Sequence, residues 1–165
     1  MSPRDRFSLV GHADMAFMNP LGEDELVTLL EPIGLEPRAR TLDLGGGRGD
    51  LSRLLSTRWG CIAVSVDSSP AASDLARERT RGLSVEVHTL RAEDYLATHR
   101  PRDLSLVSVL GAMHAFGPGL PGYQRADRQL APLTSHILFA DVVALGRRGA
   151  RAFEVATAAE RSEER

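Results

Sequence analysis

The chain is organised around one segment, Thr41-Leu42-Asp43-Leu44-Gly45-Gly46-Gly47-Arg48-Gly49-Asp50-Leu51. Its first four residues indicate a short buried strand, and four glycines in the next five positions indicate a turn. Beyond the turn, apolar residues recur at the spacing of one helical face: Leu51, Leu54, Leu55 and Trp59. Glycine lets a ligand approach bare main chain, and the N-terminus of the next helix offers N–H groups without partners. The segment therefore predicts a binding site for a polar, partly anionic small molecule.

Composition and charge indicate one ordinary globular domain. The chain has 165 residues, 42% of them hydrophobic, and a formal net charge of −2. Charges of both signs are interleaved, so nothing favours a nucleic acid or an anionic membrane as a partner. All 20 basic residues are arginines, which excludes a lysine nucleophile. The single cysteine, Cys61, excludes an intramolecular disulfide, and the absence of an apolar leader favours a cytoplasmic protein.

Periodicity predicts strands that alternate with helices. Strands are expected at 41–44, 61–67, 83–90, 104–110 and 136–143, and helices at 20–30, 51–59, 70–81, 92–99 and 122–130. This alternation gives an α/β fold with a parallel sheet and helices on both faces. We expect a single domain over residues 1–165, with an N-terminal cap and helix at 1–37, a core at 38–145 and a helical tail at 146–165.

The spacing of the glycines tests whether the ligand is a dinucleotide. The dinucleotide fingerprint G-x-G-x-x-G/A has only a partial match, Gly47-x-Gly49-x-x-Ser52, whose third position is wrong. Asp67 ends the second expected strand, where a carboxylate can accept both hydroxyls of a ribose. Because dinucleotides and other nucleoside cofactors all carry a ribose, Asp67 does not decide between them, but it indicates an adenosine-type nucleoside. As an alternative, Asp67 serves only the N-terminus of the helix that follows.

The run Asp43-x-Gly45-x-Gly47-x-Gly49 resembles the first motif of the class I S-adenosylmethionine-dependent methyltransferases, and residues 7–145 are similar to small-molecule members of that family. The resemblance implies a Rossmann-like, doubly wound, mostly parallel sheet of about five strands in the order 3-2-1-4-5. It also implies S-adenosyl-L-methionine as cofactor and S-adenosyl-L-homocysteine as product. By the same resemblance, Asp43 orders the amino end of the methionine moiety, Gly45 to Gly49 admit its carboxylate, and Asp67 holds the ribose. The expected cofactor-binding residues are Asp43, Gly45, Gly46, Gly47, Gly49, Asp67, Ser68, Ala92, Glu93 and Leu110.

The segment after the third strand departs from the family's pattern. The family places an acid followed by alanine there, and the acid bonds the adenine amino group. This chain has Arg91 at the place of that acid, before Ala92. Glu93 and Asp94 are the acids available to replace it, with the Ala92 N–H facing the ring. As an alternative, they are only the acidic first turn of a helix.

The loop at 111–117 resembles the loop after the fourth strand of small-molecule methyltransferases, and its His114 is expected beside the methyl acceptor. Histidine suits proton removal near neutral pH, so His114 is the candidate general base. The Asn/Asp-Pro-Pro-Tyr/Phe signature is missing, which argues against methylation of a nucleobase or an amide nitrogen. No histidine has a partner at metal-ligand spacing, so no metal site is expected.

The class normally continues with two further strands that form an antiparallel hairpin. Roughly 20 residues follow Val143, too few for both strands and their helix, so we expect the hairpin to be missing. A naturally short enzyme, a shortened chain and a homodimer that completes its site all remain open. The leading hypothesis is a methyltransferase with a small-molecule acceptor. The alternatives are a non-catalytic or partner-dependent cofactor-binding domain and, less favoured because of Ser52, an NAD(P)-dependent oxidoreductase.

Overall fold

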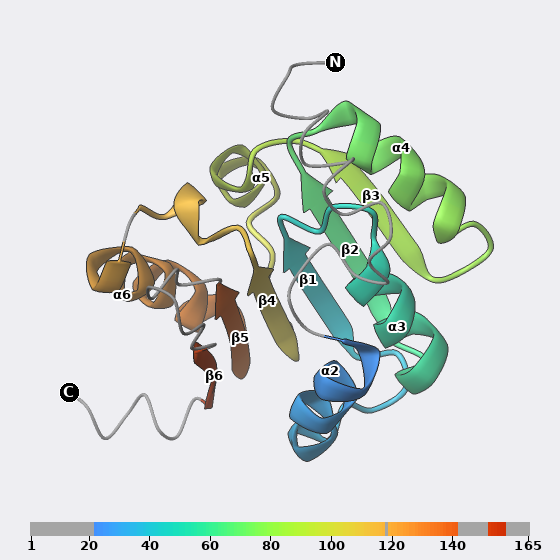
Figure 1. The fold of residues 1–165 in the computed structure, drawn as a ribbon, viewed down its shortest axis with the longest axis horizontal. Helices are drawn as coiled ribbons and strands as arrows, with labels where there is room; N and C mark the ends of the chain where they lie inside the picture. Colours follow the sequence, from blue (N-terminus) through green and yellow to red (C-terminus); the bar gives the residue numbers. More distant parts are fainter. Residues whose placement is uncertain (1–21, 118, 142–151, 158–165) are drawn as a thin grey trace, which may run out of the picture.

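The structure is a computed structural model that describes residues 22–117, 119–141 and 152–157. Helices cover both faces of one sheet with the strand order β3-β2-β1-β4-β5-β6 (Figure 1). The strands are β1 (Arg40–Leu44), β2 (Ile62–Asp67), β3 (Val85–Thr89), β4 (Leu106–Leu110), β5 (His136–Asp141) and β6 (Ala152–Thr157). The α-helices are α2 (Glu23–Leu30), α3 (Asp50–Trp59), α4 (Pro70–Arg79), α5 (Ala92–His99) and α6 (Gly119–Leu130). The 3-10 helices are η1 (Glu31–Ile33), η2 (Met113–Ala115) and η3 (Ala131–Leu133).

The first five strands are parallel, with β1 at the centre between β2 and β4. The outer pairs are β2 with β3 and β4 with β5. This arrangement confirms the α/β, Rossmann-like order 3-2-1-4-5. The carboxyl ends of β1, β2 and β4 therefore lie together at one edge of the sheet, which is where open α/β sheets bind ligands.

Apolar layers on both sides of the sheet form the core. One layer joins α2 and α3 to the sheet through Leu26, Leu30, Leu51, Leu54, Leu55, Leu106, Leu110 and Leu138. The other joins α5 and α6 to the sheet through Leu42, Leu44, Val66, Tyr95, Val107, Ala126, Leu130 and Ile137. Every residue of β4 is buried, whereas the edge strand β3 is half exposed. Both observations agree with the apolar run predicted for a central strand and the alternation predicted for an edge strand.

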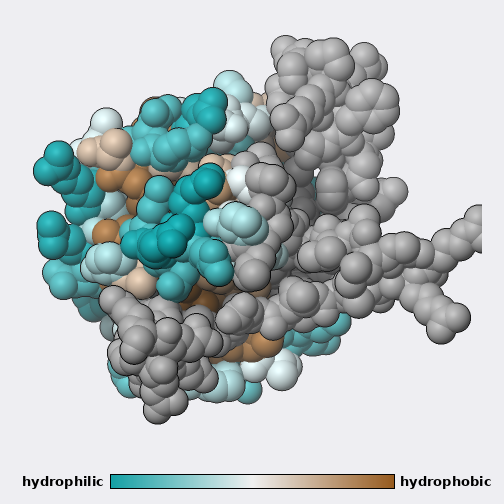
Figure 2. Space-filling view, turned by 90° about the vertical axis from the view of Figure 1, so that its left-hand side faces the viewer, coloured by the Kyte–Doolittle hydropathy of each residue, from teal (hydrophilic) through white to brown (hydrophobic). Residues whose placement is uncertain are grey.

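The outer face of α6 is polar. Figure 2 looks onto the side of the molecule where α6 lies, and hydrophilic side chains cover most of the described surface there. The exposed residues of this helix include Gln124, Arg125, Arg128 and Gln129, while Ala126 and Leu130 are buried against the sheet. The helix is amphipathic, and the core uses its apolar side. Among the described residues, no helix is long and apolar enough to span a bilayer.

Local signals fix the helices that border the carboxyl edge. Helix α3 begins after Gly49, whose φ is 75°, and ends at Gly60, whose φ is 67°. Helix α4 begins at Pro70, and the Ser69 hydroxyl accepts a hydrogen bond from the Ala72 N–H at 3.4 Å. Ser69 is thus the N-cap of this helix, with proline at the first helical position. Because Asp67 ends β2 only two residues before this cap, the N-terminus of α4 lies beside the end of β2.

The prediction of a helical tail at 146–165 is wrong over residues 152–157, which form β6 and pair with β5 in antiparallel register. The Ala, Glu and Arg content of the segment favoured a helix. However, Phe153, Val155 and Thr157 are residue types that favour strands, and pairing with the edge of β5 outweighs local propensity. The expectation that the antiparallel hairpin is missing is corrected to this extent: one antiparallel strand follows β5.

Other boundaries shift by a few residues. Helix α6 begins at Gly119 rather than residue 122, and the expected loop at 111–119 contains η2. Helix α4 ends at Arg79 instead of residue 81. The expected N-terminal cap before residue 22 lies outside the described residues, and so do positions 142 and 143 of the expected fifth strand.

Candidate functional site

Most of the residues predicted to bind a cofactor come together at the carboxyl edge of the sheet. The glycine turn (Gly45 to Gly49) follows β1, Asp67 ends β2, and Ser68 comes directly after it. Leu110 ends β4, and Ala92 with Glu93 begins α5. The structure therefore brings the turn and the end of β2 into direct contact, and it places the other positions at the ends of neighbouring strands.

Backbone hydrogen bonds hold the glycine turn against β2. The N–H groups of Gly45 and Gly46 donate to the Val66 carbonyl at 2.8 and 3.1 Å. Gly45, Gly47 and Gly49 have φ values of 79°, 55° and 75°. These values lie in the left-handed region, which side chains with a Cβ disfavour. The turn thus depends on glycine for its conformation as well as for any ligand above it.

Packing within the chain gives the glycines a second role. A Cβ at Gly45 would overlap the side chain of Ala112, which belongs to the loop after β4. A Cβ at Gly46 would overlap the Ser65 hydroxyl. At Gly49 it would lie 3.1 Å from the Ala76 Cβ on α4, closer than almost all real contacts of a Cβ. Sequence reasoning explained these glycines by the backbone conformation of the turn and by ligand approach, and close packing within the chain adds an independent reason.

Asp67 joins the turn to the start of α4. Its Oδ2 accepts a hydrogen bond from the Gly47 N–H at 2.9 Å, and its Oδ1 accepts one from the Ser69 N–H at 2.8 Å. A carboxylate oxygen accepts more than one hydrogen bond, so both oxygens retain capacity for hydroxyl donors. Asp67 is half-buried and faces the edge where the turn lies. The predicted contact with a ribose fits this geometry and stays a prediction.

Asp43 lies beneath the turn in a buried polar row. It is 4% exposed, and its register partners are Ser65 on β2 and Ser108 on β4. The Ser108 hydroxyl donates to Asp43 Oδ1 at 2.8 Å. The pKa of Asp43 is raised from 3.8 to about 7, with burial as the largest cause. The Ser108 hydrogen bond acts to lower this pKa, and the nearby carboxylates of Asp67 and Asp50 act to raise it.

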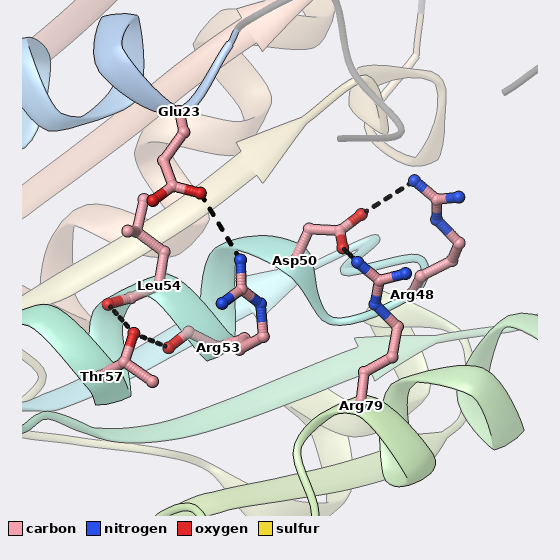
Figure 3. A network of polar contacts seen from close by, with 7 residues as sticks. All are labelled: Glu23, Arg48, Asp50, Arg53, Leu54, Thr57 and Arg79. Carbon is pink, nitrogen blue, oxygen red and sulfur yellow. Dashed lines mark hydrogen bonds and ion pairs between the residues drawn. The ribbon is translucent and has the colours of Figure 1, made fainter. Parts of the chain in front are cut away.

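A buried ionic network lies next to the turn and was missed by the sequence reasoning (Figure 3). Asp50, the first residue of α3, is 4% exposed. Its Oδ1 lies 2.7 Å from Arg79 Nη2 of α4, and its Oδ2 lies 3.3 Å from Arg48 Nη2 of the turn. The network ties the turn to α4, in addition to the Asp67 contact with Gly47. In the sequence, the only indication of this ionic network was Arg48, a charged residue between two glycines.

At α5, the exposed Arg91 pairs with Glu93, with 2.6 Å between Arg91 Nη2 and Glu93 Oε1. Ala92 and Glu93 line a small hollow of about 70 Å³ together with Ala115, Phe116, Arg125 and Gln129. The hollow thus joins the start of α5 to the segment around η2. Contacts of Ala92 and Glu93 with adenine stay predictions.

His114 belongs to η2, but its side chain lies outside those that the structure describes. Its role as general base therefore stays a prediction. Leu110 is 7% exposed and packs in the layer with α2 and α3. In the described parts of the chain, no group of three or more His, Cys, Asp or Glu side chains could hold a metal ion.

We predict that Asp43→Asn reduces the pH dependence of stability. Between about pH 4 and pH 7, the native protein holds a proton on Asp43 that the unfolded chain has lost, so the free energy of unfolding falls as pH rises. The contribution is up to about 4 kcal/mol over this window. Urea unfolding of wild type and Asp43→Asn from pH 4.5 to 8 measures it. The exposed Asp24 of α2 gives the control, Asp24→Asn, which should retain the wild-type slope. Equal slopes for wild type and Asp43→Asn would contradict a buried protonated carboxyl.

We also predict that Asp50→Asn is strongly destabilising. It removes the charge of a carboxylate that is 4% exposed and that contacts Arg79 Nη2 at 2.7 Å and Arg48 Nη2 at 3.3 Å. Removal of one partner from a buried ion pair typically lowers the free energy of unfolding by about 3–5 kcal/mol. The matched control is Asp74→Asn, because Asp74 lies on α4 with an exposed side chain and pairs with Arg77 at 2.9 Å. This change should lower stability by less than about 1 kcal/mol. Chemical denaturation that gave similar losses for both variants would contradict the role of the network.

Comparison with known proteins identifies the family. Residues 41–132 match the family model described as "Methyltransferase domain". A curated relative, trans-aconitate 2-methyltransferase of Mycobacterium tuberculosis (strain ATCC 25177 / H37Ra), is 44% identical over 52 residues, which are 31% of this chain and 20% of that protein. The match thus spans about a fifth of the relative's length.

Solved structures share the fold. YjhP from E. coli superposes with a TM-score of 0.71 at 23% identity, over 87% of this chain and 59% of that one. A SAM-dependent methyltransferase from Geobacter sulfurreducens, solved in complex with S-adenosyl-L-homocysteine, gives a TM-score of 0.64 at 24% identity, over 82% and 55%. With more than half of its length matched by the family model, the chain belongs to the methyltransferase-domain family and has the class I, Rossmann-like fold.

Proposed function

We propose that this chain binds S-adenosyl-L-methionine over the glycine turn and transfers its methyl group to a small molecule. The observation that carries the proposal is the hydrogen bond from the Gly47 N–H to Asp67 Oδ2. It sets bare main chain beside a carboxylate with acceptor capacity in a chain of the methyltransferase family. The S-adenosyl-L-homocysteine bound to the Geobacter sulfurreducens neighbour supports the choice of cofactor.

The polar groups of the site suit this ligand. Asp67 has capacity for hydroxyl donors, and among the described residues no cation pairs with the buried Asp43. A ligand that carries ribose hydroxyls at one end and an ammonium at the other would match both. The cofactor supplies a methyl group on a sulfonium that is ready to leave. The chain's own task is to hold an acceptor in line with that methyl group, which is worth up to roughly 7–11 kcal/mol of the barrier.

The acceptor that we propose is a small metabolite. The Mycobacterium tuberculosis relative is named for trans-aconitate, so small carboxylic acids are the first acceptors to test. His114, in η2 after β4, is the proposed general base. We further propose a single cytoplasmic domain with no nucleic-acid partner. A homodimer stays a prediction, which sedimentation equilibrium tests.

The cofactor assignment predicts that S-adenosyl-L-homocysteine binds the wild type and that Asp67→Asn weakens it by about 10- to 100-fold. The change removes a charged acceptor, and hydrogen bonds to charged groups are worth about 1.5–3 kcal/mol. Isothermal titration calorimetry measures the affinity, with thermal unfolding to confirm that the variant is folded. The control is Asp74→Asn, which alters an exposed carboxylate on α4 and should bind as the wild type does. No binding by wild type, or undiminished binding by Asp67→Asn, would refute the assignment.

The general-base assignment predicts that His114→Gln lowers kcat by about 10²–10⁴-fold once an acceptor is known. Affinity for S-adenosyl-L-homocysteine should stay unchanged, because His114 is not among the residues proposed to bind the cofactor. The control is His136→Gln, since His136 begins β5 at the opposite edge of the sheet and bonds Ser105 and Ser135. Equal rates for both variants would exclude His114 as the base.

A second candidate is a cofactor-binding domain without catalysis, or one that acts only with a partner. The observation in its favour is the Arg91–Glu93 pair, which engages an acid that was expected at the adenine. Binding of S-adenosyl-L-homocysteine without turnover over a broad panel of acceptors would favour this candidate. Turnover of any acceptor by the purified chain would exclude it.

A further inference from the structure

Asp43 is a buried carboxyl without a cation beside it. It is 4% exposed, and the hydrogen bond that it receives comes from the neutral hydroxyl of Ser108. Within the described parts of the chain, no arginine or histidine forms an ion pair with it. Asp50 gives the contrast, since that equally buried carboxylate contacts two guanidinium groups, of Arg48 and Arg79. A buried carboxylate without a counter-ion is unstable, and the usual outcome is that it takes up a proton.

The charged groups around Asp43 do not offset this. From β2 it faces Asp67, and from α3 it faces Asp50, whose charge is balanced by its own arginines. From β4 it faces only the Ser108 hydroxyl. Burial has the largest effect on the pKa of Asp43, which is raised to about 7, and both carboxylates act in the same direction. Three acids therefore lie near the glycine turn, and burial together with the two neighbouring carboxylates favours the protonated form of Asp43.

The main chain of the glycine turn lies close to Asp43. Asp43 Oδ2 lies 3.1 Å from the point where a Cβ at Gly46 would be, and the Ser65 hydroxyl occupies that point, so the absence of a side chain at Gly46 lets the main chain of the turn approach both groups. The Ser65 hydroxyl at the same point is fully buried and has no hydrogen-bond partner. A ligand group that lies against the turn is therefore close to both an acid and a hydroxyl without a hydrogen-bond partner.

We infer that Asp43 carries a proton in the free protein and releases it when a ligand with a cationic group binds over the glycine turn. In this step the carboxyl O–H bond breaks, the proton passes to the solvent, and the negative charge stays on Asp43 opposite the ligand's cation. No electron is transferred. The site thereby selects ligands with an ammonium group over neutral analogues. The inference rests on the proposed function, in which the amino end of the methionine moiety is that cation.

The inference makes cofactor binding dependent on pH. Affinity for S-adenosyl-L-homocysteine should rise about tenfold per pH unit between pH 5 and 6.5 and level off above about pH 7, because only the ionised carboxyl pairs with the ammonium. Its analogue 5′-methylthioadenosine has the same nucleoside and thioether but no amino acid. Its affinity should stay constant over the same range.

Titration calorimetry in two buffers of different ionisation enthalpy counts the protons. At pH 6 we expect close to one proton released per S-adenosyl-L-homocysteine bound and none for 5′-methylthioadenosine. Asp43→Asn should abolish the release, because an amide has no proton to lose in this range. If that variant does not fold or bind, the Ser108→Ala variant tests the same proton release. Loss of the hydroxyl donor should move the affinity inflection of Ser108→Ala to higher pH than in wild type.

The outcomes separate the two proposals. Binding of S-adenosyl-L-homocysteine without proton release would overturn the inference and leave the proposed function intact. Proton release that persists in Asp43→Asn, or an inflection that Ser108→Ala leaves in place, would also overturn it. Absence of binding at every pH from 5.5 to 8.5 would overturn the proposed function together with the inference.

Discussion

The carboxyl edge of the sheet depends on the closure of the glycine turn onto β2. Three successive N–H groups, those of Gly45, Gly46 and Gly47, donate to the Val66 carbonyl and the Asp67 carboxylate. The turn is therefore positioned by the neighbouring strand rather than by side chains of its own. Because Asp67 also accepts from the Ser69 N–H, the same carboxylate fixes where α4 begins. The Asp67 side chain thus connects the turn, the end of β2 and the start of α4, and the other residues of the site lie around these three segments.

The three acids near this frame are stabilised in different ways. Asp67 is held by backbone N–H groups, and Asp50 by the guanidinium groups of Arg48 and Arg79. Asp43 has the hydroxyl of Ser108. Backbone donors and arginines both stabilise the charged form of a carboxyl, whereas a single hydroxyl in a buried position does so weakly. Of the three acids, Asp43 is consequently the one whose negative charge would have no cation or backbone N–H of the described residues beside it, and it lies beneath the turn.

Much of the fold and part of the site followed from local sequence patterns. The run from Thr41 to Leu51 predicted β1, the turn and α3, because glycine conformation and helical periodicity are local properties. Asp67 was found because strand ends at the same edge of a parallel sheet meet. Strand β6 was not found, since its pairing with β5 joins the sheet through long-range contacts that outweigh the helical propensity of its composition. The ion pair between Asp50 and Arg79 was missed for the same reason, because it joins two helices whose relative position no local pattern records.

The glycines of the turn serve packing within the chain as well as any ligand above them. Side chains at Gly45, Gly46 and Gly49 would crowd Ala112, Ser65 and Ala76, so packing within the chain is a reason for these glycines that does not involve a ligand. The glycines alone therefore do not establish a binding site. What points to a ligand is the acid beneath them. A turn that served only the fold would be more stable over an apolar residue than over a buried carboxyl with no counter-ion, since burial of such a group is unfavourable. Retention of an acid at a place where it weakens the fold is typical of functional sites. The combination of a turn closed by β2 and an unbalanced Asp43 is thus stronger evidence for a charged ligand than either feature is by itself.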